Sequence, residues 1–175
     1  MTILMIIAAI IAIPLIVALF TRKDYRIEKE VIISRPKQDV FNYIKMLRNQ
    51  NNYSKWVMMD PNAKMEYTGT DGTPGFAMAW DSENKNVGKG IQTITGIKEG
   101  ERMDLKVQFI KPFAGLADAY IATDAVSLEQ TKVTWAFSSR MNYPMNIMLL
   151  VMNMDKMVGN DLSTGLGNLK KVLEK

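Results

Sequence analysis

Two aspartates and a tyrosine have the spacing that could support acid–base chemistry. Asp118, Tyr120 and Asp124 fall on one face of a regular strand, because side chains an even number of positions apart point the same way. A solvated strand face explains these aspartates better than a catalytic site, since buried carboxylates need partners. Other acid–base candidates are scattered: Asp60, Glu66, Asp81 and Arg102. We therefore expect no catalytic residues, and the sequence leans away from an enzyme.

The composition excludes several kinds of site. The 175 residues contain neither cysteine nor histidine. Disulfides, thiolate nucleophiles, Ser-His-Asp and Cys-His catalysis, and zinc sites built from these residues are therefore ruled out. The acidic residues show no calcium-loop spacing, so we expect no metal and no cofactor. The net charge of +4 is scattered rather than gathered in one basic stripe, which argues against nucleic acid as a partner.

The N-terminus begins with a long apolar run, from Ile3 to Phe20, interrupted by Pro14. About 20 such residues span the hydrocarbon core of a bilayer. The run has no preceding positive charge and no small-x-small cleavage pattern, so an uncleaved anchor at residues 1–22 is favoured over a signal peptide. Basic residues follow it directly: Arg22, Lys23 and Arg26. By the positive-inside tendency, we expect a single-pass membrane protein whose remaining domain, 23–175, faces the cytoplasm.

Beyond residue 22 the pattern predicts a strand, two helices, six strands and a long helix. Alternating apolar residues predict a first strand at 25–34, and Pro36 is typical of the first turn of the helix that follows. A long amphipathic helix is expected at 154–175, with Gly165 on its apolar side. Turn residues at short spacing delimit the other strands, at 64–70, 75–81, 87–98, 102–111, 117–129 and 132–141. A seven-stranded antiparallel sheet against a long helix is an α+β arrangement.

Several short motifs occur in an order that resembles one known superfamily. They are Ile33-Ser34-Arg35-Pro36 before Val40-Phe41, then Trp56, Gly88-Lys89-Gly90, Thr131-Lys132-Val133-Thr134-Trp135, and Gly165-Leu166 before Leu169-Lys170. Over residues 25 to 175 the chain resembles the START-like, or SRPBCC, superfamily, and within it the polyketide cyclase/dehydrase and lipid-transport group. The resemblance implies a helix-grip fold, in which a curved sheet wraps the C-terminal helix and leaves an apolar cavity. Because members of the superfamily differ widely in function, the function must be argued from the site.

Large apolar side chains at inward-alternating positions form the candidate ligand-binding set. An ordinary core explains any one of them, but together they exceed what a solid core requires, and a pocket explains them better. Tyr120 could also offer a hydroxyl to the ligand, although it would then share the inward face with Asp118 and Asp124. The set comprises Trp56, Phe76, Met78, Trp80, Phe109, Tyr120, Trp135, Phe137, Met148, Met152 and Gly165.

The methionine-rich segment from Met141 to Met157 allows three interpretations. It can be a buried lead-in to the last helix, a flexible lip that admits the ligand, or a contact with a membrane surface. Three functions also remain open. The expected one is a membrane-anchored binding or carrier domain for an apolar small molecule, such as a lipid, isoprenoid or polyketide-like compound. The alternatives are a polyketide cyclase/dehydratase-type enzyme and a non-catalytic interaction domain with a closed core.

Overall fold

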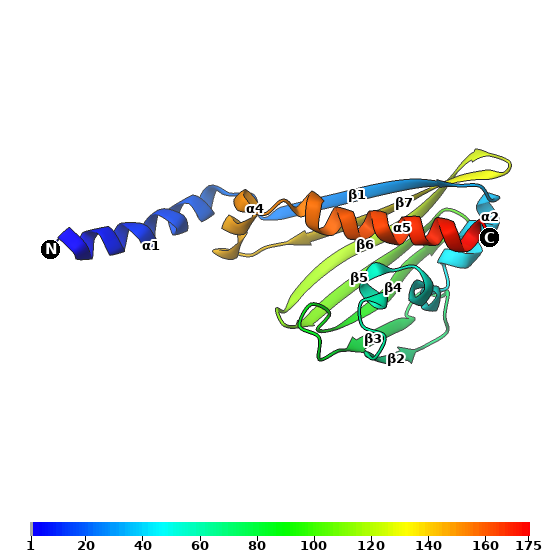
Figure 1. The fold of residues 1–175 in the computed structure, drawn as a ribbon, viewed down its shortest axis with the longest axis horizontal. Helices are drawn as coiled ribbons and strands as arrows, with labels where there is room; N and C mark the ends of the chain where they lie inside the picture. Colours follow the sequence, from blue (N-terminus) through cyan, green and yellow to red (C-terminus); the bar gives the residue numbers. More distant parts are fainter. Residues whose placement is uncertain (1) are drawn as a thin grey trace.

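A curved sheet with helices on one side makes up the domain (Figure 1). The computed structural model describes residues 2–175, without the side chains of residues 4, 5 and 7–9. The seven strands are antiparallel in the order β1-β7-β6-β5-β4-β3-β2. They are β1 Asp24–Ile33, β2 Lys64–Thr68, β3 Ala77–Asp81, β4 Lys89–Lys98, β5 Arg102–Lys111, β6 Gly115–Ser127 and β7 Gln130–Arg140. The predicted seven-stranded α+β, helix-grip-like fold is confirmed.

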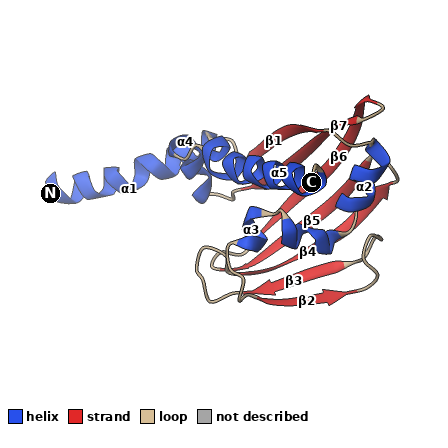
Figure 2. Cartoon of the chain, turned by 45° about the vertical axis from the view of Figure 1, so that its right-hand side comes forward, coloured by secondary structure: helices blue, strands red, loops and turns tan. Residues whose placement is uncertain are grey.

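The helices lie mainly on one side of the sheet. Between β1 and β2 the chain forms α2 (Lys37–Ile44), the short 3-10 helix η1 (Leu47–Asn52) and α3 (Lys55–Met58). Figure 2 shows α2 and α3 on the same side of the sheet as the C-terminal helix α5 (Asn160–Leu173). The sheet therefore has one covered face and one face that carries charged side chains.

The core lies where α5 meets the long strands. Alternation along β5 directs Met103, Leu105 and Val107 inward, as a half-buried strand requires. The apolar stripe of α5 consists of Leu162, Leu166 and Leu169, which are fully buried in the same core, and α5 packs against β1 and β7. Around Met103 and Leu105 the interior is closely packed, whereas Val107 borders a cavity.

Hydrogen bonds hold the end of α5 against the start of the domain. Lys170 Nζ donates to the Ile32 carbonyl at 2.8 Å, and the backbone N–H of Ser34 donates to Glu174 Oε1 at 2.5 Å. Arg35 Nε donates to the Leu173 carbonyl at 2.5 Å. Of these contacts, the one from Arg35 satisfies a carbonyl group that the helix C-terminus leaves without a partner, whereas the other two join side chains at the end of α5 to the backbone of Ile32 and Ser34. Together they fix the C-terminal end of α5 against the end of β1 and the residues that follow it.

The segment before α5 is irregular rather than a continuous helix. It contains the 3-10 turn η2 (Met145–Ile147), the short α4 (Met148–Val151) and a π-helical turn, η3 (Asp155–Gly159). Lys29 Nζ pairs with Asp155 Oδ1 at 2.8 Å and holds the π turn on β1. The predicted helix from 154 therefore has a π turn as its first part, and the regular α-helix begins at Asn160.

Helix α1 (Thr2–Phe20) projects away from the sheet (Figure 1). Its last turn contacts the domain, where Asn146 Nδ2 donates to the carbonyls of Ala18 at 2.7 Å and Thr21 at 2.9 Å. In the described part of the chain, none of the helices combines the length and the hydropathy that a membrane-spanning segment needs. The predicted transmembrane anchor and single-pass membrane localisation are therefore wrong.

Candidate functional site

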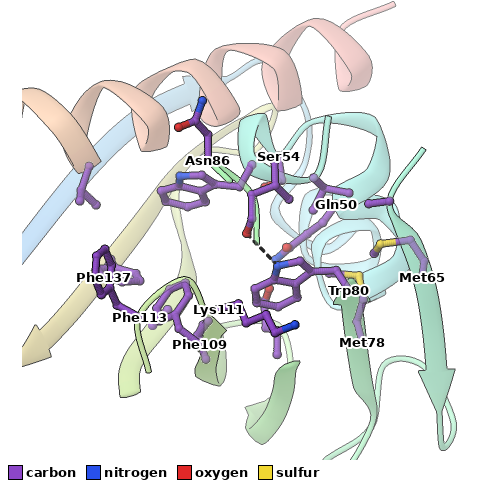
Figure 3. Close-up of a pocket in the computed structure, with 18 of the residues that line it drawn as sticks. Gln50, Ser54, Met65, Met78, Trp80, Asn86, Phe109, Lys111, Phe113 and Phe137 are labelled. Carbon is purple, nitrogen blue, oxygen red and sulfur yellow. Dashed lines mark hydrogen bonds between the residues drawn. The ribbon is translucent and has the colours of Figure 1, made fainter. Parts of the chain in front are cut away.

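A cavity of about 370 Å³ lies beside the solid core, between the sheet and the helical segments that cover it. Strands β3 to β7 supply one wall, α3 and the residues before it supply another, and Val158 of the π turn reaches it from the third side. Figure 3 shows the lining side chains converging from these elements. A volume of this size lies at the small end of the range for small-molecule sites.

Sequence reasoning and the structure agree on part of the lining. Six of the eleven predicted residues border the cavity: Trp56, Met78, Trp80, Phe109, Trp135 and Phe137. That these residues bind a ligand stays a prediction. Five of them share this position because alternation along β3, β5 and β7 points every second side chain to the covered face, and Trp56 reaches the cavity from α3.

The other predicted residues lie elsewhere. Phe76 is buried in the solid core, where its ring stacks on Tyr67 with centroids 6.3 Å apart. Gly165 is also buried but faces the back of the Trp135 ring rather than the cavity. The remaining members also lie outside the lining: Tyr120, Met148 and Met152. The two methionines belong to the irregular segment before α5, whose path no periodic pattern predicts.

The expected inward orientation of Tyr120 is wrong. Alternation on β6 buries Ala117, Ala119 and Ile121, so Tyr120 points to the opposite, charged face. There its hydroxyl donates to Glu28 Oε2 at 2.8 Å and accepts from Arg26 Nη2 at 2.8 Å. The Arg26 guanidinium first, and then the Tyr120 hydroxyl, lower the pKa of Glu28. This is a surface ion-pair network, not part of the cavity.

The two aspartates considered for acid–base chemistry share that outer face. Asp118 Oδ1 lies 3.0 Å from Lys106 Nζ, and Asp124 Oδ2 lies 3.6 Å from Lys132 Nζ. Both carboxylates are largely exposed and neutralised by neighbouring lysines. The conflict between a buried tyrosine and buried carboxylates therefore disappears, because all three side chains point outward.

Aromatic rings form a continuous band along the cavity wall. Trp135 meets Trp56 edge to face with centroids 5.9 Å apart, and Trp56 lies 6.2 Å from Phe137. Phe137 lies 6.4 Å from Phe109, which meets Trp80 edge to face at 6.3 Å. These spacings are those of favourable aromatic pairs. The band gives the cavity a stiff apolar surface.

Hydrogen bonds fix two of the indole rings in this band. Trp80 Nε1 donates to the Val87 carbonyl at 3.2 Å, the contact drawn as a dashed line in Figure 3. Trp56 Nε1 donates to Asp161 Oδ2 at 3.0 Å, and Asp161 also pairs with Lys55. Asp161 thus joins α3 to α5 and holds Trp56 at the cavity.

The polar part of the lining is small and mostly uncharged. It includes Gln50, Ser54, Asn86 and Gln92. Gln50, Ser54 and Asn86 lie in η1 or in loops, where no periodic pattern indicates them, and Gln92 lies on β4. Among the described residues, the ionisable side chains that line the cavity are Tyr25 and Lys111. Burial raises the pKa of the Tyr25 hydroxyl, so Tyr25 is neutral near neutral pH.

The family follows from the sequence match. Residues 24–174 match the family model described as polyketide cyclase / dehydrase and lipid transport. The chain belongs to this family. No curated protein sequence matches it. The resemblance to this group that the motifs indicated is thereby confirmed for the domain.

Solved structures with a similar fold share little sequence identity with this chain. A protein from Thermobifida fusca, solved by NMR in solution, has a TM-score of 0.61 at 13% identity, over 83% of this chain and 90% of its own. Norcoclaurine synthase from Thalictrum flavum, in complex with dopamine and hydroxybenzaldehyde, has a TM-score of 0.61 at 11% identity, over 91% and 92%. The Aha1 dimer from Colwellia psychrerythraea has a TM-score of 0.59 at 12% identity, over 86% and 96%. At these identities the likeness extends to the fold alone.

Proposed function

We propose that this family member binds or carries an apolar small molecule of the lipid, isoprenoid or polyketide type in the cavity between the sheet and the helices. The observation that carries the proposal is the aromatic-lined cavity of about 370 Å³ beside a solid core. A domain that used its interior only for stability would fill this space, because protein interiors are normally close-packed. The cavity therefore favours ligand binding over the closed-core interaction domain.

The charges around the cavity favour binding over acid–base catalysis. Within the described part of the chain, Lys111 and Tyr25 are the ionisable lining residues, and no carboxylate lines the cavity beside them. General acid–base catalysis needs a positioned proton donor or acceptor with a pKa near the working pH. Burial raises the pKa of the Tyr25 hydroxyl, which takes it further above that range. A binding or carrier role needs no such group.

A cyclase-type enzyme is the second candidate, and the family supports it. The norcoclaurine synthase of similar fold is in complex with dopamine and hydroxybenzaldehyde. Lys111, an exposed cation on the cavity lining, is the side chain here that could take part in a reaction. Turnover of a reactive polyketide-like substrate that is lost in Lys111→Met while binding remains would support this second function.

The first experiment asks whether the purified full chain holds a ligand. Organic extraction followed by mass spectrometry should recover an apolar molecule that is enriched over a mock purification. All three tryptophans of the chain line the cavity, so their emission reports on added fatty acids or isoprenoids. Absence of both an extracted molecule and a change in tryptophan emission would contradict the proposed function.

A matched pair of variants on β6 tests whether the cavity is the binding place. Ala119 is buried and lines the cavity, whereas Ala122 lies on the opposite face of the same strand. Ala119→Leu should fill part of the cavity and lower probe affinity, and Ala122→Leu should leave the affinity unchanged. Equal effects of the two substitutions would place binding elsewhere.

A further inference from the structure

Among the described lining residues, one side chain is charged near neutral pH, and it lies at the end of the aromatic band. Lys111 is the last residue of β5 and lines the cavity, two residues after Phe109 of the band. Figure 3 shows it next to Phe109 and Trp80. Lys111 is exposed, so it marks the place where the cavity opens to solvent. The turn that follows carries Phe113, which is 81% exposed and also lines the cavity.

The neighbouring loop fixes the position of Lys111. Gly88, with a φ of +63°, lies at the end of the loop between β3 and β4 and packs against the end of β5. A Cβ atom at position 88 would lie 2.1 Å from the Lys111 carbonyl oxygen, so only glycine allows this approach. The same loop supplies Val87, a lining residue whose carbonyl accepts from Trp80 Nε1 at 3.2 Å. The mouth of the cavity is therefore built from two segments that contact each other.

The ammonium group of Lys111 is not neutralised by a nearby carboxylate. Its cross-strand partner Lys89 pairs with Asp81 at 2.6 Å, and Lys64 is the partner of Asp81 on β2. The hydrogen bond from Lys89 mainly lowers the pKa of Asp81, and the charges of the three lysines lower it further. Glu66 acts on Lys89 in turn, and in the described part of the chain no carboxylate forms an ion pair with Lys111. The cavity mouth therefore has a positive charge without a counter-ion.

An anionic head group fits this mouth better than a neutral or a cationic one. A cation would meet the like charge of Lys111, and a neutral group would leave that charge unpaired. A carboxylate at the mouth keeps its contact with water, so it avoids the cost of burying an ion in the apolar interior. At an exposed site the attraction is modest, up to about fivefold in affinity, and it decreases as salt is added.

We propose that the ligand is an anionic amphiphile of the fatty acid type, with its carboxylate at Lys111 and its apolar chain along the aromatic band. This inference rests on the proposed binding function and names the class of its ligand. The chain runs from Trp80 and Phe109, beside Lys111, toward Trp56 and Trp135 at the other end of the band. Lys111 thereby orients the ligand, with its head outward and its chain inward.

Three probes with similar linear chains and different head charges test this preference: decanoate, decanol and decyltrimethylammonium. Binding to the full chain is followed by tryptophan emission, below the concentrations at which the probes form micelles. Decanoate should bind at least about threefold more tightly than the cationic probe near neutral pH. Added salt should weaken the binding of decanoate but not that of decanol. This comparison uses only the wild-type protein, so it does not depend on the folding of a variant.

A pair of charge reversals on β5 then assigns the preference to the mouth. Lys111→Glu reverses the charge at the cavity. Lys106→Glu makes the same change in net charge on the outer face of the same strand, where Lys106 pairs with Asp118. Lys111→Glu should invert the order of decanoate and the cationic probe and leave the affinity for decanol within about twofold of wild type. Lys106→Glu should keep the wild-type order.

The outcomes separate this inference from the function on which it rests. Equal binding of all three probes would overturn the carboxylate inference and leave apolar binding intact. A preference for decanoate that persists in Lys111→Glu, or that both reversals reduce equally, would also overturn it, because the anion would then be held by other charges. Binding of none of the probes, together with no extracted molecule, would overturn the proposed function itself.

Discussion

Trp80 lies flat against Gly90, its cross-strand partner on β4. A Cβ atom at position 90 would lie 2.4 Å from Cζ2 of the Trp80 indole and 2.6 Å from the Gln108 carbonyl oxygen. Only a residue without a side chain leaves room for the ring over the strand, an arrangement in which an aromatic side chain covers a glycine of the neighbouring strand. The ring is then fixed by its hydrogen bond to Val87 and its contact with Phe109. Gly90 thus determines the position of one cavity wall.

Gly90→Ala should damage both the fold and the site. The new methyl group has to displace either the indole or the backbone of β5, a form of overpacking that costs about 1–3 kcal/mol. We expect a lower urea midpoint and weaker binding of the apolar probe, because a displaced Trp80 enters the cavity. Gly96→Ala is the control, since its Cβ would be 3.6 Å from the nearest atom, Asp104 Oδ2, an ordinary contact. A Gly90→Ala protein with unchanged binding would contradict the role assigned to this pair.

The contact between the C-terminus and β1 should depend on pH. The backbone N–H of Ser34 is the main cause that lowers the pKa of Glu174, and Lys170 adds to the effect. Because the folded pKa is lower than the unfolded value of about 4.3, Glu174 stabilises the fold fully above that value. The stabilisation is lost as the pH falls through the folded pKa. Urea unfolding of wild type and Glu174→Gln should therefore differ near pH 7 and converge at lower pH. A difference that stays constant with pH would exclude this linkage.

Much of the fold was predictable because it depends on simple periodicity. Met103, Leu105 and Val107 alternate with polar residues, and the structure buries all three on β5. Tyr120 is an exception, because its aromatic character predicts an inward position although its even spacing from Asp118 and Asp124 places it with them on the outer face.

The missed site residues have a different physical cause. Gln50 lies in a short 3-10 helix, and Ser54 follows it, so neither belongs to a period that sequence patterns reveal. Phe76 directly precedes β3 and packs against Tyr67 in the core, and alternation along the strand does not determine which neighbour such a residue contacts. The path of Met148 and Met152 depends on a π turn and an extended residue before α5. These details are set by tertiary packing.

Asp161 should matter for the position of Trp56. The carboxylate accepts from Trp56 Nε1 at 3.0 Å and pairs with Lys55, so it links α3 to α5. Asp161→Ala removes both contacts and should cost about 1–2 kcal/mol of unfolding free energy, since Asp161 is only partly buried. Asp161→Asn keeps an oxygen acceptor and should cost less. Trp56 emission in a Trp80→Phe, Trp135→Phe background measures the change. Equal losses in the alanine and asparagine variants would show that the indole hydrogen bond contributes little.

Gly165 does not line the cavity but contacts the ring of Trp135, which does. A Cβ atom there would lie 2.8 Å from Trp135 Cζ3 and 3.5 Å from the Tyr53 carbonyl oxygen. Gly165→Leu must therefore displace the Trp135 indole, and we expect the ring to move into the cavity that it lines. Part of the packing cost is offset by the better helix propensity of leucine, about 1 kcal/mol. We expect probe binding to be lost while the melting temperature falls only moderately.

Gly167→Leu is the matched control on the same helix. Nothing lies within 4 Å of a Cβ atom at position 167. This variant gains helix propensity without touching Trp135, so it should retain probe affinity and melt at the same or a slightly higher temperature. Titration of tryptophan emission and thermal unfolding of both variants measure the two effects separately. If Gly165→Leu lost binding only in proportion to its stability, the displacement of Trp135 into a ligand cavity would be refuted, because general unfolding would explain both losses.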